Sequence, residues 1–201
     1  MCGIVGSNTL STATSLAERV KERGTQRWSL TVIDRSTWTI IKLCREEGEF
    51  RKERIEELIP MEYDTTTAKY FIIHIQSPTS KVKRHHPAYY GYYHLWHNGM
   101  KDSRYLETNE WDTSTLVRGI DEVGLEFLDS FQGSFACILH RHGHPLSFFR
   151  NAISPLYMNG NLTLCSKEFE GSEKVAPNWV FSFGDHAAKA FNNTYNPYGT
   201  N

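Results

Sequence analysis

The sequence opens with Met1-Cys2-Gly3-Ile4-Val5-Gly6, and the interpretation of the whole chain depends on this stretch. If Met1 is removed, the chain begins with a cysteine that carries both a thiol and a free α-amine. An unperturbed α-amine titrates at about 7.7–8.0, so it can act as the base for the adjacent nucleophile. Gly3 then leads into Ile4 and Val5, which are typical of a buried strand. The alternative is an ordinary buried cysteine, since free cysteine is among the most buried residue types.

The composition is that of one globular domain. The chain has 201 residues, of which 39% are hydrophobic, and this size favours one domain over residues 1–190 with a polar tail over 191–201. The 22 basic residues nearly balance the 23 acidic residues, so no general attraction to nucleic acid or to a membrane surface is expected. No apolar run approaches the ~20 residues of a membrane span, and nothing resembles a signal peptide.

The cysteines and histidines are the candidate metal ligands of the chain. The four cysteines are widely spaced, without a C-x-x-C pair, at Cys2, Cys44, Cys137 and Cys165. This spacing predicts a reduced, cytoplasmic protein rather than a disulfide framework or a zinc site. His140, His142 and His144 alternate, so they could share one face of a strand and bind a metal. No carboxylate or cysteine nearby completes that set, so surface histidines are favoured, and no metal or other cofactor is expected.

The pattern of apolar residues predicts an α+β domain. Helices are expected over residues 11–24 and 112–124, with a short amphipathic helix around 127–131. Strands are expected over 28–34, 37–44, 69–75, 89–96, 133–139, 146–150, 156–158 and 162–166. The charged stretch 46–57 is expected to form a surface loop or a short helix. This order of elements suggests two β-sheets sandwiched by helices within one domain.

Short motifs follow the opening hexapeptide in a recognisable order. They are Arg23-Gly24, His74-Ile75-Gln76-Ser77-Pro78-Thr79, His86-Pro87, His97-Asn98-Gly99, Asp112-Thr113, Gln132-Gly133-Ser134-Phe135-Ala136, Arg150-Asn151, Ser154-Pro155-Leu156-Tyr157 and Cys165-Ser166-Lys167. Their order and spacing resemble a class II glutamine amidotransferase domain, a member of the N-terminal-nucleophile hydrolases. The resemblance covers about residues 2–183 and is closest to asparagine-synthetase-like members. It implies a four-layer αββα sandwich.

The resemblance also implies a role for each site residue. Cys2 is the expected nucleophile, which forms a γ-glutamyl thioester, and Asn98 and Gly99 are expected to hold the oxyanion. Asp112 is expected to accept a hydrogen bond from the substrate α-ammonium. The remaining substrate-binding residues are expected to be Gln76, His74, Arg23 and Thr79. From the residues alone, Asn98-Gly99 also fits a hairpin turn, and Asp112 also fits a helix N-cap.

Gln76 is the main departure from the family pattern, which has an arginine there to bind the substrate α-carboxylate. A guanidinium binds a carboxylate through charge-assisted bonds that a neutral amide cannot form. Arg23 or a residue of 81–84 could take over this role; alternatively the substrate is another amide, or the site has lost activity. Gln26 and Asn151 also replace residues that are commonly acidic in the family.

Taken together, the sequence predicts a glutaminase that releases ammonia from glutamine. Since 201 residues leave no room for an ammonia-consuming domain, the acceptor is expected to be a separate, synthetase-type protein. Two alternatives stay open. One is a catalytically weakened regulatory or binding module of the same fold, and the other is a γ-glutamyl amide hydrolase that acts without a partner.

Overall fold

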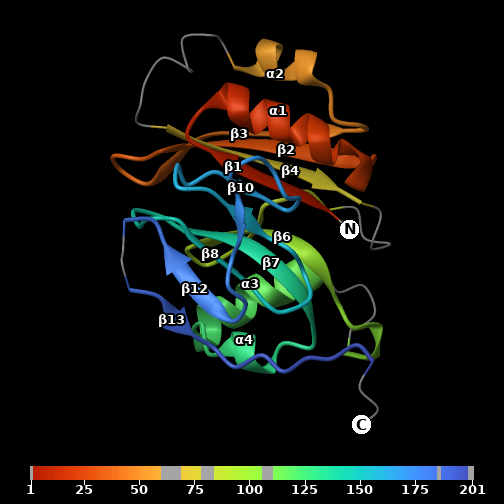
Figure 1. The fold of residues 1–201 in the computed structure, drawn as a ribbon, viewed down its shortest axis with the longest axis vertical. Helices are drawn as coiled ribbons and strands as arrows, with labels where there is room; N and C mark the ends of the chain where they lie inside the picture. Colours follow the sequence, from red (N-terminus) through yellow and green to blue (C-terminus); the bar gives the residue numbers. More distant parts are fainter. Residues whose placement is uncertain (1, 60–68, 78–83, 106–110, 185–186, 199–201) are drawn as a thin grey trace.

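The computed structural model describes residues 2–59, 69–77, 84–105, 111–184 and 187–198. Within these residues the chain forms two antiparallel sheets that pack face to face, with helices on their outer sides (Figure 1). The predicted combination of two sheets with helices is confirmed. No helix among the described residues is long and apolar enough to cross a membrane.

The first sheet has seven strands in the order β11-β9-β10-β1-β4-β2-β3. Its strands are β1 (Gly3–Ser7), β2 (Arg27–Asp34), β3 (Thr39–Glu47), β4 (Lys69–Gln76), β9 (Tyr157–Met158), β10 (Leu164–Cys165) and β11 (Glu173–Lys174). The opening stretch of the sequence thus forms the middle strand of this sheet, between β10 and β4 (Figure 1).

The second sheet has six strands in the order β13-β12-β8-β7-β6-β5. Its strands are β5 (Ala88–Tyr90), β6 (Tyr93–Lys101), β7 (Gly133–Arg141), β8 (Ser147–Arg150), β12 (Trp179–Ser182) and β13 (Lys189–Ala190). The prediction of a single strand over 89–96 is wrong, because the chain turns at Gly91 and returns as β6. The φ of Gly91 is +54°, a value that favours glycine. β12 and β13 were not predicted.

Two pairs of helices lie on the outer sides of the sheets (Figure 1). α1 (Leu10–Val20) and α2 (Lys52–Leu58) lie over the seven-stranded sheet, and α3 (Asp112–Val123) and α4 (Phe127–Ser130) lie over the six-stranded sheet. α1 begins earlier than predicted because the Thr9 side chain accepts a hydrogen bond from the backbone N–H of Thr12 and caps the helix. A short 3₁₀ helix, η1 (Lys21–Arg23), follows α1 directly.

Three separate apolar clusters show to which side of its sheet each buried side chain points. Val5, Leu30 and Ile73 pack against α1 and α2 on the outer side of the first sheet. Ile4 and Trp96 belong instead to the cluster between the two sheets. The third cluster lies under α3 and α4 and includes residues such as Leu95, Leu116, Phe135 and Phe149. Because side chains alternate along a strand, Cys2 points to the same side as Ile4, towards the second sheet.

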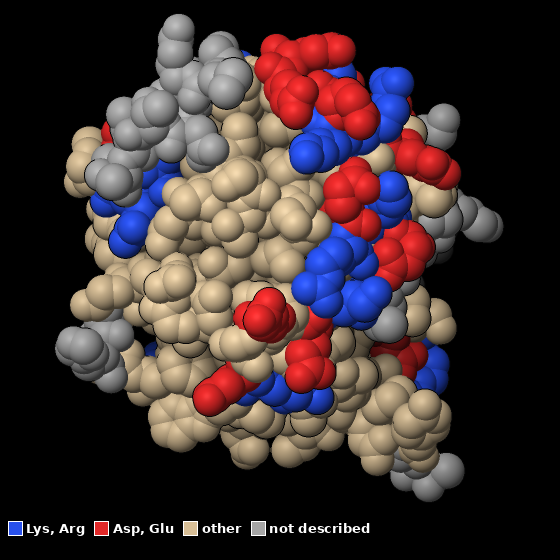
Figure 2. Space-filling view, turned by 45° about the horizontal axis from the view of Figure 1, so that its top comes forward, with Lys and Arg blue, Asp and Glu red and all other residues tan. Residues whose placement is uncertain are grey.

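The surface over α1 and α2 carries acidic and basic side chains next to one another (Figure 2). Ion pairs around these helices include Lys21–Glu18 at 2.7 Å and Lys167–Glu22 at 3.0 Å. A nucleic-acid backbone is bound through many Lys and Arg contacts to its phosphates. The mixed signs on this face do not suit such a partner.

Residues beyond β13 are held against the domain as far as they are described. The buried Asn193 donates hydrogen bonds to the main-chain oxygens of Leu128 and Phe131. It also accepts one from the Asn151 side chain. Asn151 is in turn the acceptor for the backbone N–H of Phe135 in β7. The Asn151 amide therefore both accepts from and donates to neutral backbone groups, which a carboxylate cannot do because it has no donor.

Candidate active site

Cys2 lies at the start of β1 and is buried, with 4% of its surface exposed. The register pairs Gly3 with Ile75, and continuing it by one residue places Cys2 beside Gln76 on the face towards the second sheet. Burial raises the pKa of the Cys2 thiol to about 11, while a hydrogen bond from the Ser77 backbone opposes the rise. The thiol is therefore protonated at neutral pH in this state. Cys2, Cys44, Cys137 and Cys165 are all free.

Asn98 lies on β6 with its side chain on the face turned to the first sheet, the face of Trp96. It is fully buried, and neither Oδ1 nor Nδ2 has a hydrogen-bond partner in the described part of the chain. Leaving buried polar groups unpaired costs roughly 1–3 kcal/mol each, so such an amide calls for an explanation. A ligand that bonds to it would supply one.

Gly99 lies where no side chain fits. A Cβ built on it would come 2.0 Å from the main-chain oxygen of Ser134 and 2.6 Å from Nε2 of His97. Asn98 and Gly99 lie within β6, which runs from Tyr93 to Lys101, so the hairpin-turn alternative for this dipeptide is wrong.

His74 connects the two sheets next to this dipeptide. Its Nε2 lies 3.0 Å from the main-chain oxygen of His97, and because a carbonyl only accepts, Nε2 carries the proton. The ring stacks on His86 with 3.7 Å between ring centroids, and His86 meets Trp111 edge-on. Burial lowers the pKa of His74 to about 3, so the ring is neutral at physiological pH. His74, expected to bind substrate, thus holds β6 against β4.

Asp112 begins α3 on the other side of the site. Trp111 occupies the N-cap position and Asp112 is the first helical residue, so the N-cap alternative is wrong by one residue. Its Oδ1 accepts from the Thr113 backbone at 2.7 Å, and the Thr113 hydroxyl lies 3.1 Å from Nδ1 of His97. After burial, which is the main cause, the charge of Asp112 further raises the pKa of Cys2. These contacts bring Cys2, Asp112 and the Asn98 segment to one end of the inter-sheet space.

Two other predicted substrate-binding residues are not brought to this place by the described contacts. Arg23 lies on η1, half-buried, and its charge acts on Cys165, which packs on the α1 side of the sheet. Cys2 faces the opposite side. Thr79 lies outside the described residues. The loop after η1 does reach the site through Gly24, where a Cβ would come 2.3 Å from the main-chain carbon of Gln76.

Sequence reasoning missed Arg27. It lies directly opposite Gln76 in the pairing of β2 with β4, and it is 5% exposed. Its Nε donates to both carboxylate oxygens of Glu47, at 2.9 and 3.0 Å. Arg27 comes two residues before Ser29 in a strand whose odd-numbered residues face inward, and the predicted strand 28–34 ended one residue short of it.

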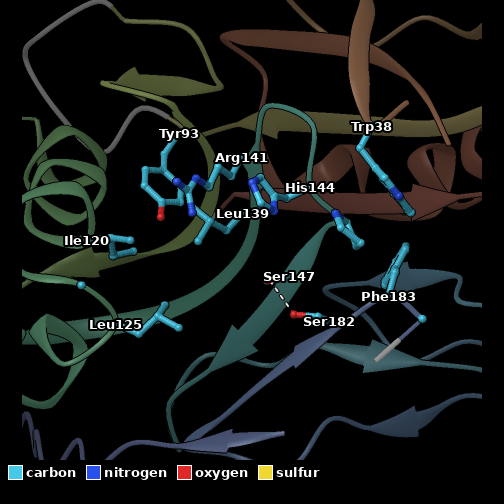
Figure 3. Close-up of a pocket in the computed structure, with 13 residues that line it drawn as sticks. Trp38, Tyr93, Ile120, Leu125, Leu139, Arg141, His144, Ser147, Ser182 and Phe183 are labelled. Atoms are coloured by element: carbon cyan, nitrogen blue, oxygen red, sulfur yellow. Dashed lines mark hydrogen bonds between the residues drawn. The ribbon is translucent and has the colours of Figure 1, made fainter. Parts of the chain in front are cut away.

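A separate cavity of about 540 Å³ lies at the other end of β6, where Tyr93, Leu139, Arg141 and His144 line it (Figure 3). Ser147 and Ser182, joined by a 2.8 Å hydrogen bond, also line it (Figure 3). None of the predicted site residues lines it.

The described residues contain no group of three or more His, Cys, Asp or Glu side chains that could hold a metal ion. His140 is buried, with Nε2 2.8 Å from the main-chain oxygen of Trp38, whereas His142 and His144 are exposed. The three histidines therefore do not share one face.

Comparison with protein-family models and with curated proteins gives no match. Among solved structures, the chain is similar to the glutamine phosphoribosylpyrophosphate (PRPP) amidotransferase from B. subtilis, complexed with ADP and GMP. The TM-score is 0.64 at 13% sequence identity, and the match covers 94% of this chain and 49% of that chain. The chain therefore shares its fold with a domain-sized part of an amidotransferase and spans about half its length.

Proposed function

We propose that this chain is a class II glutamine amidotransferase domain, with the four-layer αββα sandwich of the N-terminal-nucleophile hydrolases. It hydrolyses the side-chain amide of glutamine and releases ammonia. The observation that carries this proposal is the fully buried Asn98 amide without a partner in the described chain, on the strand that faces Cys2. The fold shared with an amidotransferase supports it.

In the proposed reaction, Cys2 is the nucleophile and its own α-amine is the base, once Met1 has been removed. The amine takes the thiol proton as Sγ attacks the amide carbon, and the carbonyl oxygen becomes an oxyanion. Nδ2 of Asn98 and the backbone N–H of Gly99 donate to that oxyanion. Collapse breaks the carbon–nitrogen bond, ammonia leaves with the proton from the amine, and a γ-glutamyl thioester remains. Water then hydrolyses the thioester to glutamate and restores the thiol.

The environment of Cys2 explains why this reaction needs an adjacent base. A thiol with a pKa of about 11 carries almost no thiolate at neutral pH, because burial disfavours the charged form. A base that removes the proton only as the bond forms avoids a stable buried anion. An α-amine attached to the same residue satisfies that need without any other side chain.

We further propose that the chain resembles the asparagine-synthetase-like members and acts in the cytoplasm, where free cysteines such as Cys2 stay reduced. The ammonia is proposed to pass to a separate acceptor protein. The shared fold accounts for 49% of the matched amidotransferase, which leaves half of that chain for other tasks. Co-purification of a synthetase-type protein from the native source tests this point, and full glutamine turnover by a lone monomer counts against it.

The proposed function is tested by labelling with 6-diazo-5-oxo-L-norleucine, a glutamine analogue that alkylates an activated thiol, followed by intact mass. The wild-type protein should begin at Cys2 and gain one adduct. Cys44→Ala, which alters a half-buried cysteine on β3, should gain the same adduct, and Cys2→Ala none. An unlabelled wild-type protein that also releases no ammonia from glutamine would leave the chain as a binding module of the same fold.

A further inference from the structure

Four residues form a row across the inner face of the seven-stranded sheet. Arg27 lies opposite Gln76 on one side and opposite Glu47 on the other, and Cys2 follows beside Gln76. Residues directly opposite each other in a sheet point to the same face. Since neighbouring strands lie about 4.7–4.9 Å apart, the backbones of Cys2 and Arg27 are about 10 Å apart. The row therefore leads from the proposed nucleophile to a buried cation.

Arg27 uses only part of its hydrogen-bonding capacity. In the described part of the chain, each of its side-chain hydrogen bonds leaves through Nε, towards the two oxygens of Glu47. A guanidinium has five N–H donors, and its planar fork matches the two oxygens of a carboxylate. No described residue bonds to the terminal nitrogens Nη1 and Nη2, so these nitrogens can bind a further anionic partner. The Arg27 side chain is only 6% exposed, so such a contact would be weakly screened by solvent.

Glu47 holds Arg27 from the outer end of the row. Its side chain is 68% exposed, and it also accepts from Nε2 of His85 at 3.0 Å. A carboxylate in this position neutralises the buried cation through Nε, and no described residue bonds to the opposite edge of the guanidinium. The pair therefore orients Arg27 without using the donors that a substrate would need.

Gln76 separates the cation from the nucleophile, and it is neutral. Its Oε1 is buried and has no partner among the described residues, so it can accept a bond but cannot balance an anion. Asp112, whose charge acts on Cys2, lies across the site on α3. A negative and a positive group therefore flank the nucleophile from different elements, which suits a substrate that carries both an ammonium and a carboxylate.

The dimensions agree with an amino-acid amide of the length of glutamine. Four carbon–carbon bonds separate the amide carbon of glutamine from its α-carboxylate carbon, a distance of about 5 Å. Attack on the amide needs about 3–3.5 Å between the reacting atoms, and a guanidinium–carboxylate pair adds about 4 Å. The sum, about 12 Å, is slightly longer than the backbone separation of about 10 Å, which suits an Arg27 side chain whose Nε reaches towards Glu47, away from Cys2.

We propose that Arg27 is the carboxylate anchor of this site: its terminal nitrogens bind the α-carboxylate of the amide substrate, across β4 from Cys2. This inference rests on the proposed function. It makes Arg27 a specificity-determining residue that selects amides bearing a free carboxylate, and it provides the cation that Gln76 does not supply.

The test compares ammonia release from glutamine with release from 4-aminobutanamide, which is glutamine without its α-carboxylate. For Arg27→Met, KM for glutamine should rise about 100-fold with kcat nearly unchanged, because two charge-assisted bonds are lost from the bound substrate. Activity on 4-aminobutanamide should stay at the wild-type level. Arg27→Lys should recover part of the loss, and Arg19→Met on α1 serves as the matched control.

Glu47→Gln separates the anchor from a merely structural ion pair. The glutamine oxygen can still accept from Nε of Arg27, so Arg27 keeps its orientation and its charge, and KM for glutamine should change less than about threefold. A structural pair would give Glu47→Gln and Arg27→Met the same effect, and that result would overturn the proposal, as would an equal loss on both substrates in Arg27→Met. If the wild-type protein itself releases no ammonia and Cys2 is not labelled, the proposed function fails instead.

Discussion

Nε2 of His74 lies 3.0 Å from the main-chain oxygen of His97, so the strand next to Cys2 in one sheet is bonded to the strand that carries Asn98 in the other. The spacing between the proposed nucleophile and the proposed oxyanion donors therefore depends on a buried imidazole. His86 stacks on the same ring and Trp111 closes the stack from the start of α3. The start of α3, the segment before the β5–β6 hairpin and both sheets thus meet at this end of the domain.

The buried histidines predict that acid destabilises the protein. Burial lowers the pKa of His74 to about 3 and the pKa of His86 well below its usual value, whereas an unfolded histidine titrates near 6.5. The unfolded state binds more protons below pH 6.5, so the free energy of unfolding should fall as the pH falls. The slope should approach about 1.4 kcal/mol per pH unit for each histidine.

Urea unfolding between pH 7.5 and 5 measures this slope. His74→Phe keeps a stacked ring but cannot take up a proton. It should therefore reduce the slope of unfolding free energy against pH by the contribution of one histidine, at most about 1.4 kcal/mol per pH unit. His142→Gln, at an exposed position, should leave the slope as it is. Equal stability of the wild-type protein at both ends of this range would contradict the prediction.

Removal of Met1 should control activity. With an N-terminal extension that cannot be removed, the nitrogen of Cys2 is part of a peptide bond and cannot accept a proton. Ammonia release should then fall by roughly 10²–10⁴-fold, the usual contribution of a general base. In the mature protein, kcat/KM should rise with pH and level off near the amine pKa, at about 8. An extended protein as active as the mature one would show that another group is the base.

Two of the strands that carry the site, β1 and β4, could be predicted from local pattern. They contain apolar stretches such as Ile4-Val5 and Ile72-Ile73, and burial of such residues does not depend on their partners. The position of Arg27 could not be recognised in this way. Its relation to Cys2 depends on the register across three strands, which is a tertiary property.

Other elements were missed for a different reason. β12 and β13 are short strands at one edge of the second sheet, and Lys189–Ala190 has no apolar pattern that would indicate a strand. The turn at Gly91 was missed because tyrosines lie on both sides of it and read as one aromatic strand. In each case the neighbouring strand, rather than the local sequence, decides the structure.

Gly99→Ala should destabilise the fold severely. The new Cβ would lie 2.0 Å from the main-chain oxygen of Ser134, so β6 and β7 would have to separate where they are paired. We expect a loss of several kcal/mol in the free energy of unfolding, measured with urea, since backbone cannot move aside as a flexible side chain can. Gly160→Ala is the matched control because nothing lies within 4 Å of its Cβ. Equal effects of the two substitutions would contradict this account.

Asn98→Leu should stabilise the protein while it removes activity. Leucine has nearly the shape of asparagine, and the amide atoms that it replaces have no partner among the described residues. Replacing an unsatisfied buried amide should gain about 1 kcal/mol, or roughly 2–4 °C in Tm for a chain of this size. Loss of an oxyanion donor should at the same time lower kcat by about 10²–10³-fold.

These two opposite changes distinguish a group kept for function from one kept for the fold. A structural Asn98, bonded in solution to groups within the protein, would lose stability together with activity when replaced by leucine. A functional Asn98 tolerates its unsatisfied state because substrate completes it, a common conflict between activity and stability at enzyme sites. Differential scanning calorimetry and ammonia release on the same preparation decide between them, and a lower Tm in Asn98→Leu would count against the oxyanion role.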